Sequence, residues 1–146
     1  MRRHKDRLWT WLLPEEPRGI NEDEWARSGG KWIVFDKEEK ILNLAEKLAP
    51  LVDSGEVVSA KYWNGDPSAV CVYSLDRDRD KTWGILKRLG AGDSIVWEYD
   101  FAWDKNIREP LEFLFSWSSK FRTIVQSYGV FGTLRLIREV LIGSRK

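Results

Sequence analysis

Four side chains have the types and spacing of a site that binds a planar anion: Trp25, Lys31, Lys61 and Trp63. Lys61 and Trp63 lie two apart in a run typical of a β-strand, so their side chains point to the same face of a sheet. An ammonium group beside an indole offers phosphate a charge partner and offers a base a ring on which to stack. We therefore expect these residues to bind an anionic, planar or phosphorylated ligand, such as a nucleotide or an RNA end. The two tryptophans would stack and the two lysines would supply charge.

The chain holds nine tryptophans in 146 residues. Because tryptophan buries a large apolar area in a core, any of these side chains can have a packing role instead of a binding role. Alternation from Ile95 places Trp97, Tyr99, Phe101 and Trp103 on one side of a strand, where we expect them to form core beneath helices. Glu98 and Asp100 alternate with them, and we interpret this second side as a solvated face.

Cofactor and metal chemistry have no pattern here that supports them. Asp76, Asp78 and Asp80 alternate like the start of a calcium loop, but no glycine follows at the sixth position and Lys87 stands at the twelfth. No phosphate-binding glycine loop, dinucleotide fingerprint, nucleophile elbow or zinc spacing is present. We predict no cofactor and no metal, and we interpret Cys71 as a small buried hydrophobe.

The length of the chain predicts one domain spanning residues 1–146. No apolar run reaches about 18 residues, so we expect no membrane contact and a cytoplasmic location. Residues 1–7 carry a net charge of +3 and residues 120–146 carry +5, whereas the whole chain carries +1, so the segment between them carries −7. We expect residues 1–7 to form a flexible basic tail. Whether the two basic ends meet in one patch stays open.

The hydrophobic periodicity predicts alternating strands and helices after a first strand at Leu8–Leu13 and a short helix capped by Asn21. The further expected elements are a strand at Lys31–Phe35, a helix after Asp36 that ends near Gly55, a hairpin of Glu56–Trp63 and Ala69–Leu75, a second helix that ends at Gly90, a strand from Ile95, and a helix at Phe121–Ile142. This pattern predicts a single α+β domain. It would be a curved antiparallel sheet with a βαββαβ core, helices on one face, an extra C-terminal helix and an aromatic-lined concavity on the other face.

Three segments carry a resemblance to a known family: Ser28–Phe35, Val57–Lys61 and Ala69–Tyr73. With the helix that follows the first segment, they resemble the basophilic leukaemia-expressed protein family, over roughly Leu8 to Phe101. That family is similar in fold to the messenger-RNA cap-binding translation initiation factor. The resemblance implies that factor's fold, with Trp9 and Trp11 in its tryptophan-rich first strand.

The same resemblance aligns Trp25 with a tryptophan that stacks on the cap, and Lys61 with a basic residue that binds phosphate. The glutamate that should follow the stacking tryptophan is replaced by Ala26 here, and Glu24 precedes it instead. The resemblance therefore implies the fold and an anion site, but not recognition of the cap.

Two alternatives to ligand binding remain open. The family is also described as similar to bacterial phosphothreonine lyases, which remove phosphate by elimination, and Lys61 would then be the catalytic base acting on a phosphorylated peptide. The one histidine, His4, lies in the expected tail. The second alternative is an interaction module that docks a protein partner on its outer face.

Overall fold

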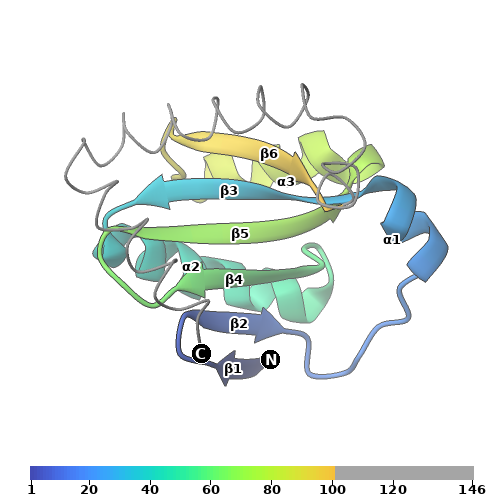
Figure 1. The fold of residues 1–146 in the computed structure, drawn as a ribbon, viewed down its shortest axis with the longest axis horizontal. Helices are drawn as coiled ribbons and strands as arrows, with labels where there is room; N and C mark the ends of the chain where they lie inside the picture. Colours follow the sequence, from blue (N-terminus) through green and yellow to red (C-terminus); the bar gives the residue numbers. More distant parts are fainter. Residues whose placement is uncertain (101–146) are drawn as a thin grey trace.

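The structure is a computed structural model that describes residues 1–100 of the 146-residue chain. Figure 1 shows a mixed α+β fold in which strands and helices alternate along the chain. The strands are β1 (Arg2–Lys5), β2 (Trp9–Leu13), β3 (Gly29–Asp36), β4 (Ser59–Trp63), β5 (Ser68–Leu75) and β6 (Ile95–Tyr99). The helices are α1 (Glu22–Ser28), α2 (Glu38–Ser54) and α3 (Arg79–Arg88), with a short 3-10 turn η1 (Asp76–Asp78) before α3.

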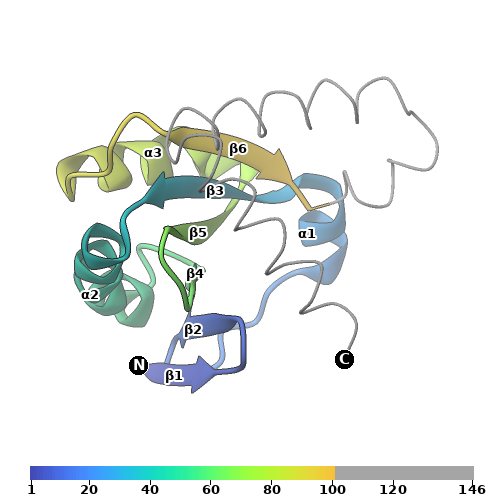
Figure 2. The same cartoon turned by 60° about the vertical axis from the view of Figure 1, so that its left-hand side comes forward.

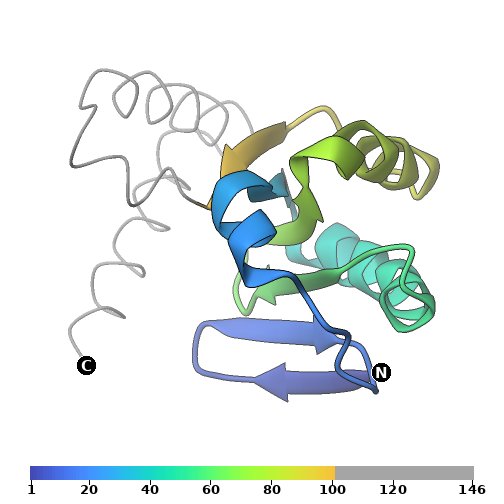
Figure 3. The ribbon, with the colours of Figure 1, turned by 90° about the vertical axis from the view of Figure 1, so that its right-hand side faces the viewer.

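The six strands form one sheet in the order β1-β2-β4-β5-β3-β6, and every neighbouring pair is antiparallel. Helices α2 and α3 lie against one face of this sheet, whereas α1 lies at the start of β3 (Figures 2 and 3). The α+β class predicted from the sequence is confirmed, with a curved, open antiparallel sheet. The predicted helix at Phe121–Ile142 lies outside the described residues.

The main core lies between α2, α3 and the face of the sheet that they cover, which we call the helix face. The apolar stripe of α2 is buried there, as its spacing predicts. Strands β3 and β5 contribute alternate residues, Val34, Val70 and Val72, to the same cluster. The opposite face carries a smaller buried cluster of Ile33, Phe35, Ala69 and Cys71.

The caps of the helices differ in one detail from the expected ones. Asn21 caps α1 as predicted, because its side chain accepts the N–H of Glu24. Asp36 accepts the N–H of Lys37 at 2.8 Å, but the residue in the N-cap position of α2 is Lys37 itself, which makes no side-chain cap. Gly55 ends α2 at φ +85°, a left-handed conformation that glycine adopts without steric cost.

The expectation of a flexible tail at residues 1–7 is wrong. Arg2–Lys5 form β1, which pairs with β2 in the register His4 to Trp11. Arg3 also donates to the carboxylate of Glu46 on α2 at 2.7 Å. Strand pairing uses backbone groups, so a polar, charged segment can form an edge strand although its composition resembles that of a tail.

Candidate functional site

Lys61 occupies a central place on the face of the sheet opposite α2 and α3, which we call the Lys61 face. The strand register sets His4, Trp11, Lys61 and Cys71 opposite one another across β1, β2, β4 and β5. Directly paired residues of antiparallel strands share a face, so these four side chains form one row. The neighbouring row includes Tyr73.

Three aromatic rings surround the ammonium group of Lys61. Its Nζ lies 4.5 Å from the ring centroid of Trp9, 4.5 Å from that of Trp11 and 5.8 Å from that of Tyr73. The rings of Trp11 and Tyr73 are nearly parallel, with centroids 6.2 Å apart and an interplanar angle of 13°. These distances lie in the range in which a cation is attracted by the negative faces of aromatic rings.

Within residues 1–100, no carboxylate lies within 4.0 Å of the Lys61 ammonium. The side chain is half-buried, and this desolvation lowers the pKa of Lys61. The same burial raises the pKa of the neighbouring Tyr73 phenol. The site therefore holds a partly desolvated cation among uncharged rings, an arrangement that favours an incoming anion.

Lys31 sits in a different environment, because its charge is already balanced. Its Nζ lies 2.8 Å from Asp100 Oδ1 and 3.9 Å from Glu98 Oε2, and its side chain is 13% exposed. Desolvation alone would lower the pKa of Lys31, but the hydrogen bond and attraction from Asp100, with the charge of Glu98, raise it. An anionic ligand would have to compete with Asp100 for this lysine.

Asp100 also holds Trp25 in place. The indole Nε1 of Trp25 donates to Asp100 Oδ2 at 3.1 Å, and the ring lies 6.3 Å from that of Tyr73. A Cβ added at Gly29 would lie 2.6 Å from the Trp25 ring, so glycine at this position allows α1 to fold its tryptophan back against β3. Trp25 thus joins the aromatic group around Lys61.

The interpretation of Glu98 and Asp100 as a solvated face is wrong. Glu98 is 7% exposed, and it lies directly opposite Lys31 in the pairing of β6 with β3. Trp97 and Tyr99, which alternate with them, lie half-buried on the helix side, where Trp97 contacts Trp32, whereas Phe101 and Trp103 lie outside the described residues. Alternation along one strand identifies two faces, but only the neighbouring strand shows that a lysine faces the carboxylates.

Three of the four predicted ligand residues lie at or beside the ring cluster, and the fourth, Trp63, is buried. Lys61 and Trp25 border the ring cluster, and Lys31 joins it through Asp100. Trp63 is only 6% exposed and packs edge-on against Trp9, at a centroid distance of 5.1 Å and an angle of 85°. Little of the Trp63 ring is left for stacking, and its contact instead orients Trp9.

The sequence alone does not predict that Trp9, Trp11 and Tyr73 belong to the site. Their alternation was visible, since Trp9 and Trp11 are two apart and Tyr73 follows Cys71 by two. What was missing is the strand order, which places β2 and β5 on either side of β4. His4, which the sequence analysis places in a tail, also lies on the Lys61 face, with Trp11 between His4 and Lys61.

Cys71 is buried beneath this site, at 3% exposed, and burial raises the pKa of its thiol to about 11. We expect no labelling of Cys71 by a thiol reagent at pH 8 in the folded protein and complete labelling in urea, because the thiolate is the reactive form. Mass spectrometry of Lys81→Cys, which adds a thiol at an exposed helix position, provides the control and should show a single label. Rapid labelling of native Cys71 would contradict the burial.

Residues 1–100 contain no group of three or more His, Cys, Asp or Glu side chains placed to hold a metal ion. None of the helices in this part of the chain combines the length and hydropathy that a bilayer crossing requires. The chain matches no model of a known protein family, and no curated protein matches its sequence.

Proposed function

We propose that this protein binds an anionic, planar ligand, such as a nucleotide or an RNA end, on the Lys61 face. The observation that carries the proposal is the half-buried ammonium of Lys61, which has three aromatic rings around it and, among residues 1–100, no carboxylate within 4.0 Å. A phosphate that reaches it would form a charge-assisted hydrogen bond in a partly desolvated place. A base beside the phosphate would stack on an exposed part of Trp9, Trp11 or Trp25.

The four proposed residues have different roles in this account. Lys61 contacts the anion, and Trp25 contributes a ring on the α1 side. Lys31 holds Asp100, and through it the Trp25 indole, so it positions the site. Trp63 packs edge-on against Trp9 and holds its ring in position.

Titration with nucleoside monophosphates, followed by indole fluorescence, tests this function. We expect saturable quenching in the wild type and a loss of at least about fivefold in affinity in Trp11→Leu, the lower end for one stacking contact. Trp83→Leu is the matched control, since Trp83 belongs to α3 and packs on Trp32. Equal affinities in the two variants, or no saturable binding, would contradict the proposal.

The affinity for adenosine monophosphate should fall as the pH rises, and the fall should begin below pH 10.5. Burial depresses the pKa of Lys61 from its usual 10.5, so the ammonium loses its proton earlier than an exposed lysine does. The phosphate is fully ionised above about pH 7.5, so it does not contribute to this fall. Isothermal calorimetry between pH 7.5 and pH 10.5 measures the effect.

Lys61→Arg provides the control for this pH dependence, because a guanidinium stays protonated throughout the range. The affinity of Lys61→Arg for the nucleotide should not change between pH 7.5 and pH 10.5. A wild-type affinity that stays flat to pH 10.5 would show that Lys61 does not hold the anion.

Phosphate elimination from phosphothreonine is the second candidate, and two observations favour it. Burial lowers the pKa of Lys61, which increases the fraction of neutral amine that can act as a base, and His4 lies on the same face, about two strand spacings or roughly 10 Å away. In this reaction the base takes the α-proton, the C–O bond breaks, and phosphate leaves as a carbon–carbon double bond forms. Incubation with a phosphothreonine peptide would yield a residue one water lighter than threonine, whereas a peptide of unchanged mass would exclude it.

A further inference from the structure

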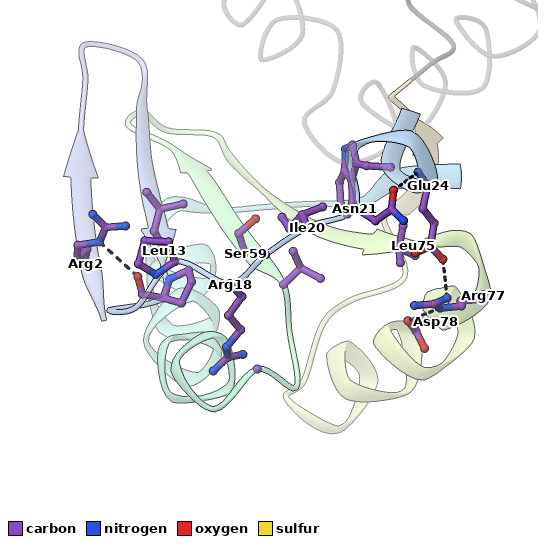
Figure 4. Close-up of a pocket in the computed structure, with 16 residues that line it drawn as sticks. Arg2, Leu13, Arg18, Ile20, Asn21, Glu24, Ser59, Leu75, Arg77 and Asp78 are labelled. Carbon is purple, nitrogen blue, oxygen red and sulfur yellow. Dashed lines mark hydrogen bonds and ion pairs between the residues drawn. The ribbon is translucent and has the colours of Figure 1, made fainter. Parts of the chain in front are cut away.

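A cleft of about 530 Å³ opens between the loop that joins β2 to α1 and the ends of the strands beneath it (Figure 4). Its apolar lining includes Leu13, Ile20, Val58 and Leu75. Ile20 is 51% exposed and lies near the middle of the cleft. The volume falls within the range of small-molecule sites, so the cleft is large enough to hold one nucleotide unit.

Two residues that line this cleft, Ser59 and Trp25, are neighbours of the ring cluster around Lys61. Ser59 pairs directly with Tyr73, and the Trp25 ring lies 6.3 Å from that of Tyr73. Tyr73 in turn borders the Lys61 ammonium. Tyr73 therefore lies between the Lys61 ammonium and the cleft, and a chain-like ligand that occupied both would pass this residue.

The charges of the cleft are unevenly distributed. At one end Arg77 pairs with Glu24, and Asp78 lies beside it (Figure 4). At the other end lie Arg2 and Arg18, neither of which has a carboxylate within 4.0 Å in the described part of the chain. The cleft thus combines an apolar lining with two guanidinium groups whose hydrogen bonds, among residues 1–100, all go to backbone oxygens.

Those two guanidinium groups keep donors for a ligand. Arg2 uses its Nε on the carbonyl of Pro14, and Arg18 uses Nη2 on the carbonyl of Asp53. Guanidinium forks bind phosphate oxygens through the N–H groups that remain. Arg2 belongs to β1, the basic edge strand that also places His4 on the Lys61 face.

We infer that the ligand of this protein is a single-stranded oligonucleotide, with one nucleotide at Lys61 and the next in the cleft. The inference rests on the proposed function, because it takes the first nucleotide to be bound at Lys61. The second base packs against Ile20 and the Trp25 side of the cleft, and the phosphate that follows it contacts Arg2 or Arg18. Alternating rings and cations along a groove are the general means by which proteins hold single strands without reading sequence.

A length series tests the inference. Uridine monophosphate, diuridylate and tetrauridylate, with the thymidine series in parallel, are titrated against the full chain by fluorescence. We expect the dinucleotide to bind at least about fivefold more tightly than the monophosphate, the lower end for one additional stacked base. Inorganic tripolyphosphate carries the charge without the bases and should bind at least about fivefold more weakly than the dinucleotide.

Two variants test whether the second nucleotide lies in the cleft. Ile20→Asp adds a negative charge to the apolar lining of the cleft. Leu42→Asp is the matched control, because Leu42 is 39% exposed on α2 outside the cleft. Arg2→Gln is compared with Arg88→Gln, an exposed position on α3. Ile20→Asp should lose the advantage of the dinucleotide, and Arg2→Gln should lower the affinity for tetrauridylate, in which a phosphate follows the second base. Both should bind the monophosphate as the wild type does, and both controls should behave as the wild type does throughout.

The outcomes separate this inference from the proposed function. A dinucleotide that binds no more tightly than the monophosphate, or equal effects of Ile20→Asp and Leu42→Asp, would overturn the second subsite and leave binding at Lys61 intact. Tripolyphosphate that binds as tightly as the dinucleotide would show that charge alone accounts for the affinity, and would also overturn it. Monophosphate binding retained in Lys61→Met would contradict the proposed function, and with it the placement of the first nucleotide, whatever the length series shows.

Discussion

Replacing Lys61 by methionine should weaken the binding of nucleoside monophosphates by about 10- to 150-fold. A hydrogen bond to a charged group contributes about 1.5–3 kcal/mol, and each 1.4 kcal/mol is a factor of ten in affinity. Lys61 is half-buried among Trp9, Trp11 and Tyr73, so methionine, of similar length and apolar, fits the same place without the charge. Calorimetry with adenosine monophosphate measures the loss.

The control for this variant is Lys81→Met, which removes a lysine from the exposed surface of α3. It should bind as the wild type does, since the two variants change the net charge equally. The stability of Lys61→Met should change by no more than about 1 kcal/mol, because the lost cation–ring attraction is offset by relief of desolvation. Affinity retained in a folded Lys61→Met protein would show that the anion does not bind at this lysine.

Replacing Lys31 by methionine should have the larger effect on the fold, lowering the free energy of unfolding by about 3 kcal/mol. Removing one partner of a buried ion pair leaves the other charge without compensation, at a cost of about 3–5 kcal/mol, and the slight exposure of this pair places the value at the lower end. Lys31 is 13% exposed, and it lies within 4.0 Å of both Asp100 and Glu98. Urea unfolding followed by circular dichroism measures the change.

Lys40→Met is the matched control for stability. Lys40 also lies near a carboxylate, 3.6 Å from Asp36, but its side chain is 70% exposed. Such a surface pair contributes only about 0–1 kcal/mol, so the control should unfold at nearly the wild-type urea concentration. The double variant Lys31→Met with Asp100→Asn should recover part of the lost free energy of unfolding, because the amide of asparagine carries no charge that needs a partner. Equal losses in Lys31→Met and Lys40→Met would contradict the assigned role of Lys31.

Much of the fold can be predicted from local patterns. The stripe of α2, the pair of β4 and β5 and the cap at Asn21 follow from residue spacing and turn chemistry, which act over a few residues. Strand β1 could not be predicted this way, because an edge strand needs only backbone partners and its charged side chains carry no apolar alternation. The basic N-terminal segment is therefore part of the sheet, beside the proposed site.

The candidate site depends more on pairing between distant strands than on any local motif. Lys61 was visible as a strand lysine with aromatic neighbours in sequence, but the rings that contact it come from β2 and β5. Lys31 was expected to meet a ligand, and the register of β6 instead places it opposite Glu98. Both facts follow from strand order, which is decided by the packing of the whole sheet.

Indole N–H resonances in a two-dimensional NMR titration show whether a nucleotide binds among the rings of the Lys61 face. Six of the seven tryptophans in residues 1–100 form two groups, with Trp9, Trp11 and Trp25 around the site and Trp32, Trp83 and Trp97 packed together on the helix side. Single tryptophan replacements assign the signals. Binding of adenosine monophosphate should shift the resonances of the first group in proportion to saturation and leave those of the second group in place. Shifts confined to Trp32, Trp83 and Trp97, or no shifts at saturating nucleotide, would contradict the account.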